Sequence, residues 1–368
     1  MANLYYINKY VPELGQYAFV YTNDPDELGA IQFVFDIDNP VTKNQIIWIQ
    51  LYEDKFEFPE DASGMFYQCS NECFNDMESW STTGCKNMSY LFSGCTNLKN
   101  MGYYKDPTVE PSAIPYYFSI NVFDTSAVTN MSHMFEECKK LETLDLYSFD
   151  TSNVTDMSYM FKVSSINHDA ALNSINVTSF NTSNVTNMAW MFSGIGSSTM
   201  YDLDFSSFDT SKVTNMSYMF FGCSATGIQP NNLDFSSCTD ASYLVAATRA
   251  TEYDVSQIDF TNINCYRMFS GCSLLRTVHL GEFDLSSTDS VDGMFMECYN
   301  LESVYATPGT DWTQYSKFSP GLQPFMNCYN IHNWSGNDTI KNANNTKAGG
   351  YFMVGPKTWK AYTIYVKV

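Results

Sequence analysis

A short motif, M-S-x-M-F, recurs along most of the chain and constrains its fold more than any other feature. We call the phenylalanine that closes each copy the anchor. The anchors are Phe66, Phe92, Phe135, Phe161, Phe192, Phe220, Phe269, Phe295 and Phe325, and Val245 takes the place in one degenerate copy. Most anchors follow the previous one after about 26 residues, a period typical of solenoids built from stacked units, so the sequence predicts about ten units.

Each unit contains a predicted short helix. Apolar residues stand seven, four and one residues before the anchor and three and six residues after it. These positions share one side of a helix with about 3.6 residues per turn. An Asn or Asp five residues before the anchor, such as Asn130 or Asp156, lies where a helix N-cap is expected.

A predicted strand follows each helix. Apolar and polar residues alternate in Leu144-Asp145-Leu146, Ile175-Asn176-Val177, Leu203-Asp204-Phe205, Leu233-Asp234-Phe235, Ile258-Asp259-Phe260 and Val278-His279-Leu280. This alternation is typical of a strand that is buried on one face. Stacked units would bring the strands into one parallel sheet with helices behind it. The predicted fold class is therefore an α/β solenoid.

The motif FDTSxVTNMSxMFxGC, with LDxSS before it, closely resembles the BspA-like leucine-rich repeat family. Such repeats are known from surface proteins of Gram-positive gut bacteria and mycoplasmas. The resemblance covers roughly Ser63 to Asn333, apart from an insertion around Tyr103 to Tyr117 and the degenerate unit at Val245. It implies a leucine-rich-repeat-like solenoid used for adhesion or recognition, with the strand ladder on its concave face and no catalytic residues to carry over.

The repeat separates three predicted domains. Residues 1–58 precede it and are expected to form a β-rich cap or attachment domain, with strands at Tyr17 to Tyr21, Ile31 to Ile37 and Ile46 to Tyr52. Residues 59–335 form the solenoid. Residues 336–368, which end in YTIYVKV, form a C-terminal β cap. Caps are expected because the ends of a solenoid expose its core.

The charge of the chain narrows the range of partners. A net charge of −21 argues against nucleic acid, whose phosphates require Lys and Arg, and against docking on an anionic membrane surface. No apolar run is long enough to cross a bilayer, so we expect no membrane insertion. The N-terminal MANLYYINKY lacks the basic stretch and apolar run of a secretory signal. We therefore expect location on a virion, which assembles before lysis, or on an extracellular surface.

The chain has eleven cysteines, and all except Cys73 stand at apolar positions of the repeat. A free cysteine behaves as a small buried hydrophobe, so the pattern predicts buried thiols without disulfides. The spacings do not match a zinc site, and we expect no metal and no cofactor. No histidine is paired with a nucleophile by a known motif, which indicates a non-enzymatic protein. Paired carboxylates leave a glycosidase open.

Two rows of exposed residues are candidate binding surfaces. The first, the aspartate row, is the outward strand position, expected on the concave face: Asp145, Asn176, Asp204, Asp234 and Asp259, followed by His279 and Tyr305. The second, the aromatic row, stands two residues before the anchor and is expected on the convex side: Tyr90, His133, Tyr159, Trp190, Tyr218 and Tyr243. Extended faces of solenoids bind partners, and aromatic rings can anchor sugars or proteins. Packing between neighbouring units explains both rows equally well.

These observations favour a recognition or adhesion protein exposed on a particle or cell surface. The leading hypothesis is a phage virion component, such as a tail, head-fibre or receptor-binding protein. Its partners would be a protein or glycan of the host surface, or neighbouring virion proteins. One alternative is a bacterial cell-surface adhesin without its export signal, and another is a polysaccharide-cleaving enzyme. Of the two rows, the aspartate row is the first choice for binding, because a line of like charges has no evident use in packing.

Overall fold

The structure is a computed structural model of the chain. It describes residues 5–11, 16–22, 32–35, 46–50, 56–69, 80–99, 101, 120–164, 170–196, 203–225, 227–281, 288, 290–306, 324–331 and 352–354. The predicted C-terminal strand at YTIYVKV, the insertion around Tyr103 to Tyr117, and Cys73 lie outside these residues. The chain divides into two units: residues 1–212 with 222–224, and residues 213–221 with 225–368.

The first unit begins with two antiparallel strand pairs. Strand β1 (Tyr5–Val11) pairs with β2 (Gln16–Thr22), and β3 (Gln32–Phe35) pairs with β4 (Ile46–Gln50). The last three of these strands were predicted from their alternating apolar residues, whereas β1 was not. The predicted boundary at residue 58, and the role of this region as a cap, stay predictions.

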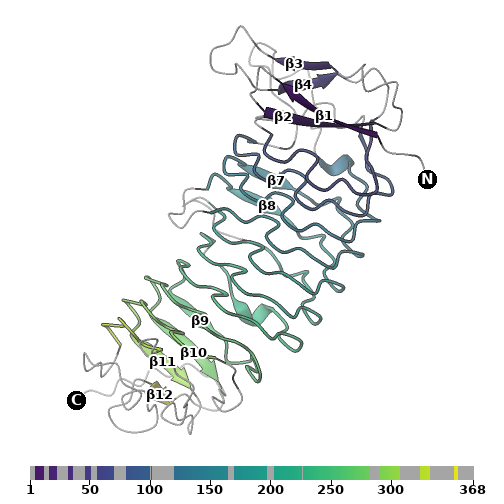
Figure 1. Cartoon of the computed structure of the whole chain (residues 1–368). Helices are drawn as coiled ribbons and strands as arrows, with labels where there is room; N and C mark the ends of the chain where they lie inside the picture. Colours follow the sequence, from purple (N-terminus) through teal and green to yellow (C-terminus); the bar gives the residue numbers. More distant parts are fainter. Residues whose placement is uncertain are drawn as a thin grey trace, which may run out of the picture. The chain divides into compact units, whose positions relative to one another are not determined.

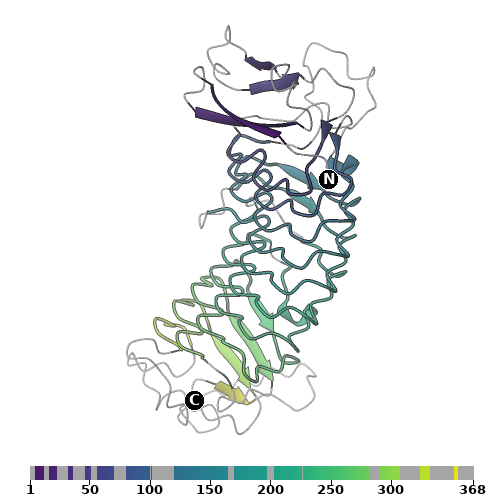
Figure 2. The same cartoon turned by 45° about the vertical axis from the view of Figure 1, so that its right-hand side comes forward.

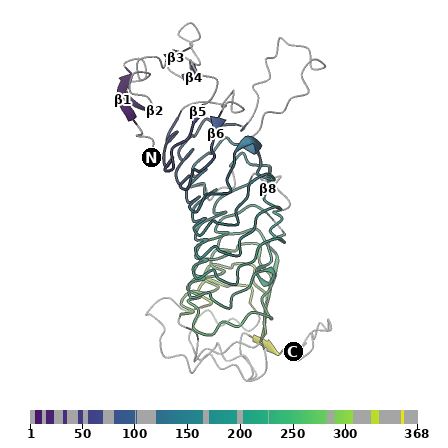
Figure 3. The ribbon, with the colours of Figure 1, turned by 90° about the vertical axis from the view of Figure 1, so that its right-hand side faces the viewer.

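Parallel pairs follow in the same unit. Strand β5 (Phe56–Glu57) pairs with β6 (Trp80–Ser81), as Figure 3 shows. Strand β7 (Thr143–Asp145) lies beside β8 (Ser174–Asn176) (Figure 1). Each pair joins residues from successive repeats, so consecutive repeats form coils that are stacked on one another. A short 3-10 helix, η3 (Ile120–Val122), lies between β6 and β7.

The second unit contains a four-stranded parallel sheet. Its order is β12 (Phe352–Val354), β11 (Ser303–Ala306), β10 (Thr277–Gly281) and β9 (Glu252–Asp254). Figure 2 shows these strands from a second side. A 3-10 helix, η4 (Pro230–Asn232), precedes the sheet. The prediction of parallel strands is thus confirmed in both units.

Some predicted strands do not form. Leu203-Asp204-Phe205, Leu233-Asp234-Phe235 and Ile258-Asp259-Phe260 have no strand assignment. In the last case the strand of that repeat is β9, which ends at Asp254, and the chain has already entered a turn in which the Ile258 N–H donates to the Val255 oxygen at 3.1 Å. Alternation alone did not distinguish the strand from the turn that follows it.

The predicted helix of each repeat is wrong. None of the described residues forms an α-helix, and the M-S-x-M-F segment is a succession of turns. In the repeat of Phe135, the N–H of Met134 donates to the Met131 oxygen at 3.3 Å, and the N–H of Glu136 donates to the His133 oxygen at 3.1 Å. Each such bond closes a turn between residues three apart, whereas an α-helix bonds residues four apart.

The alternate N–H groups of the segment point to the next coil. Those of Met131, His133, Phe135 and Glu137 donate to oxygens of the coil that contains Phe161, at 3.0, 2.9, 2.8 and 2.8 Å. The coil of Phe92 donates in the same way to that of Phe135. Every N–H of the segment is therefore bonded either within its own coil or to the next one. Because buried backbone groups must be paired, this pattern satisfies the segment as fully as a helix would.

The turns require a left-handed backbone two residues before the anchor. Tyr159 has φ 60°, and Trp190 has φ 63°. The other members are Tyr90, His133, Tyr218, Tyr243 and Arg267, with Gly64 and Gly293 at the same position in two repeats. Residue i+2 of a type II turn takes such a φ, which costs a residue with a side chain about 1 to 2 kcal/mol. The bonds to the next coil offset this cost.

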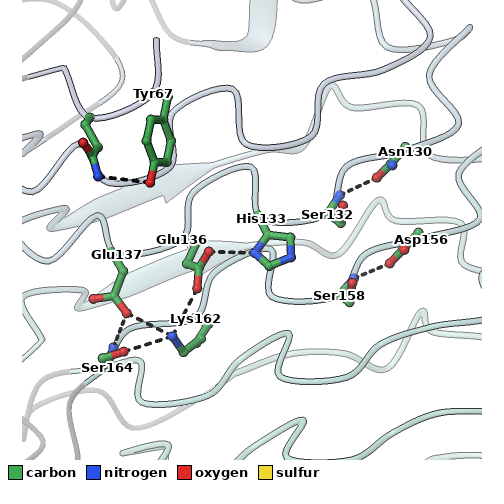
Figure 4. A network of polar contacts seen from close by, with 11 residues as sticks. Tyr67, Asn130, Ser132, His133, Glu136, Glu137, Asp156, Ser158, Lys162 and Ser164 are labelled. Atoms are coloured by element: carbon green, nitrogen blue, oxygen red, sulfur yellow. Dashed lines mark hydrogen bonds and ion pairs between the residues drawn. The ribbon is translucent and has the colours of Figure 1, made fainter. Parts of the chain in front are cut away.

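The Asn or Asp five residues before the anchor closes an Asx turn. The Asn130 Oδ1 accepts the N–H of Ser132 at 2.9 Å, and the Asp156 Oδ1 accepts that of Ser158 at 2.8 Å (Figure 4). The predicted use of the side-chain oxygen is confirmed, but it supports a turn and not a helix N-cap. Parallel bridges also link Asn130 to Asn87 and to Asp156, so these residues align from coil to coil.

The anchors stack inside the coils. In the first unit the rings of Phe66, Phe92, Phe135, Phe161 and Phe192 follow one another at centroid distances of 5.4, 5.6, 5.9 and 5.5 Å. In the second unit Phe269, Phe295 and Phe325 do so at 5.3 and 5.2 Å. All eight rings are buried. Stacked aromatic pairs contribute about 0.5 to 1.5 kcal/mol beyond their buried area, so each added coil extends the core.

Buried hydroxyl groups join the same coils. The Thr125 Oγ1 donates to the Asp150 oxygen at 3.0 Å, and the Thr151 Oγ1 donates to the Asn181 oxygen at 2.9 Å. Both threonines are buried, and the next threonine of the row, Thr182, makes the equivalent bond to Asp209 at 2.8 Å. A buried hydroxyl is costly unless it is bonded, so the row also favours coils of matched register.

The cysteines occupy the core, as predicted. All ten cysteines in the described residues are free, and all except Cys69 are buried. The Cys298 Sγ donates to the Phe269 oxygen at 3.0 Å, and the Cys328 Sγ donates to the Phe295 oxygen at 2.9 Å. Burial raises the pKa of the Cys85 thiol to about 11. Such thiols stay protonated at neutral pH and react slowly.

Substitution of Tyr159 distinguishes the turns from a helix. We expect Tyr159→Gly to be more stable than Tyr159→Ala by about 1 kcal/mol, because glycine adopts positive φ without strain. In a helix the order would be reversed by about the same amount. The measurement is the free energy of unfolding of both variants in urea. The same pair at Tyr147, whose φ is not positive, is the control and should show no advantage for glycine.

Because the ten described cysteines are free and nearly all buried, we expect the stability of the protein not to depend on disulfides. We expect the melting temperature to be the same with and without a thiol reductant, and with and without a chelator. Loss of a native disulfide typically costs about 2 to 5 kcal/mol, which would shift the melting temperature by several degrees. Differential scanning calorimetry measures this, and such a shift with either reagent would contradict the prediction.

Candidate recognition surfaces

The aspartate row lies at the surface of its coils. Asp145, Asp204, Asp234 and Asp259 are exposed, and Asn176 is half-buried. The register of β7 and β8 places Asp145 opposite Asn176, whose Nδ2 donates to the Asp145 Oδ1 at 2.9 Å. At this point of the row, a neutral amide is hydrogen-bonded to a carboxylate, so the two neighbours do not repel each other as like charges would.

The expected alignment of Asp259 with His279 is wrong. The register of β9 and β10 pairs His279 with Asp254, and that of β10 and β11 pairs His279 with Tyr305. The His279 and Tyr305 rings stack at 4.8 Å. Asp259 lies in the following turn, where its Oδ1 accepts the N–H of Thr261 at 2.9 Å. The sequence pattern assigned Ile258-Asp259-Phe260 to the strand, but the strand of this repeat is β9, which ends five residues before Asp259.

The carboxylates of the row have a structural use. The Asp204 Oδ1 accepts the N–H of Ser206 at 2.9 Å, and the Asp234 Oδ1 accepts that of Ser236 at 2.8 Å. These are Asx turns, which give the side-chain oxygen at this position a structural use that asparagine would serve equally well. Hydrogen bonds from the Ser206 hydroxyl and N–H hold the pKa of Asp204 below its ordinary value. Binding by the row stays a prediction.

The aromatic row is a stack of rings. In the first unit Tyr90 and His133 are 4.1 Å apart, His133 and Tyr159 4.4 Å, and Tyr159 and Trp190 5.7 Å, with interplanar angles of 8 to 12°. In the second unit Tyr218 and Tyr243 stack at 4.3 Å. The expectation of a convex side depended on a helix in each repeat, and the described residues form turns there instead. The rings cover one another, as packing between units predicts, so mainly their edges and hydroxyl groups face solvent.

A polar network adjoins the row in the first unit (Figure 4). The Lys162 Nζ lies 3.1 Å from Glu136 Oε1 and 3.1 Å from Glu137 Oε1, and it donates to the Ser164 Oγ at 2.9 Å. The His133 Nδ1 lies 2.6 Å from the Glu136 Oε2. The side chains of Lys162 and Glu136 are each only 16% exposed, so this network is better shielded from solvent than a surface ion pair.

The network holds its charges in place. Burial alone would raise the pKa of Glu136, but hydrogen bonds from His133 and Lys162 outweigh it, and the pKa lies below its ordinary value. Burial would lower the pKa of Lys162, but its bonds to Glu136 and Glu137 raise it above its ordinary value. Lys162 therefore keeps its proton at neutral pH and does not act as a base toward the Ser164 hydroxyl, as a Ser-Lys hydrolase would need.

This network was not predicted from the sequence. Glu136 and Glu137 follow the anchor Phe135, and Lys162 follows the next anchor, Phe161, directly. Alignment of the repeats on their anchors places these residues above one another. The sequence therefore contained a signal for this network, namely an acidic and a basic residue at matching positions of successive repeats.

No group of three or more His, Cys, Asp or Glu side chains in the described part of the chain is arranged to hold a metal ion. Among the same residues, no helix has the length and apolar character needed to span a membrane.

Comparisons with known proteins identify similar sequences and structures. The family described as "Mycoplasma protein of unknown function, DUF285" matches residues 60–106, 112–178, 166–258 and 195–307. No curated protein matches the sequence. A leucine rich cell surface protein from Faecalibacterium prausnitzii A2-165 is similar at 16% identity, over 87% of this chain and 97% of that one, with a TM-score of 0.25.

The network predicts an acid-sensitive contribution to stability. We expect Lys162→Met to lower the free energy of unfolding by about 1 to 3 kcal/mol at neutral pH, because two shielded carboxylates lose their partner. The pKa of Glu136 and that of Glu137 are lower in the folded state, so the stabilisation is complete above their ordinary value of 4.5 and is lost as the pH falls through the folded value.

The measurement is urea unfolding of wild type and Lys162→Met between neutral pH and pH values below 4.5. The difference between the two proteins should shrink on acidification. Lys139→Met is the control, because it removes the same charge from an exposed lysine 3.4 Å from Glu137. An equal effect of both variants, or a difference that does not depend on pH, would contradict the prediction.

Proposed function

Because the chain belongs to the DUF285 family of mycoplasma-type repeat proteins, we propose that it is a non-enzymatic recognition or adhesion protein exposed on a particle or cell surface. The family match covers most of the region in which the anchors recur and agrees with the predicted resemblance to a repeat family known from mycoplasmas. The family description names no ligand, so the chemistry of binding must come from the chain itself.

The regular display of outward side chains carries this proposal. Within each unit, inter-coil bonds hold equivalent residues in line, as Asn130 and Asp156 are held by their parallel bridge and Tyr159 and Trp190 by ring stacking. Rows of this kind present one chemical group repeatedly along a surface. Extended rows are the means by which stacked-repeat proteins bind large partners.

The overall architecture is part of the proposal. It comprises about ten coils in one curved solenoid with strands on the concave face and β-rich caps at both ends. The partner would be a protein or glycan of a host surface, or a neighbouring protein of the same particle. In a phage virion the protein would be a tail, head-fibre or receptor-binding component, and on a bacterium it would be an adhesin. Gene neighbourhood separates these settings, through capsid and tail genes or through sortase and lipoprotein genes.

A polysaccharide-cleaving enzyme is the competing hypothesis. Glycoside hydrolysis usually needs a carboxylic acid that stays protonated and a second, ionised carboxylate. In the aspartate row, hydrogen bonds from Ser206 and Thr261 lower the pKa of Asp204 and of Asp259. A carboxyl group with a lowered pKa is a poor proton donor at neutral pH. This supports binding without cleavage.

One experiment tests binding against cleavage. The labelled protein is applied to an array of bacterial and mammalian glycans and to immobilised cell-envelope fractions. The proposal expects saturable binding with no release of reducing ends from the bound polysaccharides. Release of reducing sugar with turnover would establish the enzyme instead, and failure to bind any component would contradict a recognition role.

The two rows are then compared by substitution. We expect Asp204→Asn with Asp234→Asn to weaken binding of the strongest array component about tenfold, because two charges leave the aspartate row. The fold should be unchanged, since the amide oxygen of asparagine still closes the Asx turns at Ser206 and Ser236. Truncation of Trp190 and Tyr218 to Ala is the matched comparison, and loss of binding only in that variant would transfer recognition to the aromatic row.

A further inference from the structure

One coil of the second unit departs from the repeat at two adjacent positions. The neighbouring repeats carry Ser217-Tyr218 and Ser242-Tyr243 before the anchor, but this repeat carries Tyr266-Arg267. No other described coil has an arginine or lysine two residues before its anchor. Arg267 nevertheless keeps the left-handed backbone of the row, with φ 52°. The substitution therefore changes the surface chemistry while the turn is retained.

Aromatic rings surround the guanidinium. The Tyr266 ring meets the Tyr243 ring at 5.4 Å with an interplanar angle of 67°. The Arg267 Cζ lies 5.5 Å from the centre of the Tyr266 ring and 5.9 Å from that of Tyr243. Each distance is within the range of a cation–π interaction. The guanidinium group thus lies beside both rings, at similar distances from each.

A glycine in the next coil makes room for this arrangement. Gly293 stands two residues before the anchor Phe295 and has φ 62°. A Cβ built on Gly293 would lie 3.1 Å from the Arg267 Cγ and 3.5 Å from its Nε. The arginine side chain therefore occupies the space that a side chain of the next coil would take.

The charge of Arg267 has no acidic partner among the described residues. Its Nε is buried and has no hydrogen-bond partner. Arg276 in the same unit, by contrast, lies 2.8 Å from a Glu302 oxygen. Burial and the neighbouring Tyr243 raise the pKa of Tyr218 and of Tyr266, so these hydroxyl groups stay neutral. The Arg267 guanidinium is therefore held by aromatic rings and by no described carboxylate within ion-pair distance.

We propose that Tyr243, Tyr266 and Arg267 form a binding site for the carboxylate of an acidic sugar residue in a polysaccharide. This rests on the proposed recognition function and names its ligand class. A planar guanidinium matches a carboxylate through paired hydrogen bonds. The rings of Tyr218, Tyr243 and Tyr266 follow one another, and their hydroxyl groups can exchange hydrogen bonds with the hydroxyl groups of sugar rings.

The net negative charge of the protein favours a ligand whose own negative charges are few and widely spaced. A net charge of −21 repels a polyanion, such as a sulfated glycan or a run of acidic peptide residues. A polymer with one carboxylate for every few sugar rings needs only one cation at the binding site, and Arg267 supplies that cation. An acidic peptide is therefore the competing ligand in the test.

The test uses the full chain and a tetrasaccharide of alternating glucuronic acid and N-acetylglucosamine. The N-acetylglucosamine tetramer, which has no carboxylate, is the neutral comparison, and a tetraglutamate peptide is the acidic one. Binding is followed by saturation-transfer NMR and titration calorimetry. We expect saturable binding of the acidic tetrasaccharide, at least about tenfold tighter than binding of either comparison.

Three variants assign the binding to this site. Arg267→Gln should weaken it about tenfold or more, whereas Arg276→Gln removes the same charge elsewhere in the unit and should leave it unchanged. Gly293→Ala should also weaken it, because the new methyl group, 3.1 Å from the Arg267 Cγ, shifts the arginine side chain without removing its charge. Tyr266→Ser restores the residue of the neighbouring repeats and should weaken binding with the fold intact, as checked by circular dichroism.

Equal losses in Arg267→Gln and Arg276→Gln would overturn the site, because general charge would then explain the binding. Tighter binding of tetraglutamate than of the tetrasaccharide would overturn the sugar assignment. Binding of array glycans or envelope fractions that does not change in Arg267→Gln, together with no binding of the acidic tetrasaccharide, would overturn this inference and leave the recognition function standing.

Discussion

The hydrogen bonds between successive coils at the M-S-x-M-F segment are the interaction on which the rest of the structure depends. The N–H groups of Met131, His133, Phe135 and Glu137 all donate to one neighbouring coil, and the N–H groups between them close turns within their own coil. Neither set would satisfy the segment alone. A single coil would leave half of its donors without partners, which is why such coils are stable only when they are stacked.

This dependence fixes the register of each coil against the next. Because the same atoms bond at each step, equivalent side chains of a unit lie above one another, and each position becomes a row. Inward rows form the stack of anchors, the buried threonine hydroxyls and the thiols that donate to the carbonyls of the preceding anchors. Outward rows form the aromatic stack and the Asx turns. Stacking of the coils is therefore sufficient to produce the two candidate surfaces, whether or not they bind a partner.

The sequence predicted the period, the buried positions and the parallel strands, but not the local backbone. Val128, Met131, Met134, Phe135, Cys138 and Leu141 are all buried, as their pattern indicated. Their spacing is three residues throughout except for the adjacent pair at the anchor, whereas a helical stripe mixes steps of three and four. Successive turns produce steps of three. The left-handed backbone at Tyr159 was hidden because glycine, its usual marker, is replaced there by a ring that stacking retains.

The stacking of coils also explains why the candidate sites could be predicted only in part from the sequence. A residue that recurs in every repeat has, in this fold, a structural use in every coil: Asp204 and Asp234 close Asx turns, and Tyr159 packs between His133 and Trp190. Recurrence is therefore weak support for binding. A residue that breaks the repeat while its backbone keeps the repeat's conformation is stronger support, because stacking does not require it. Arg267 meets this condition, with the φ of the aromatic row and a buried Nε that has no hydrogen-bond partner.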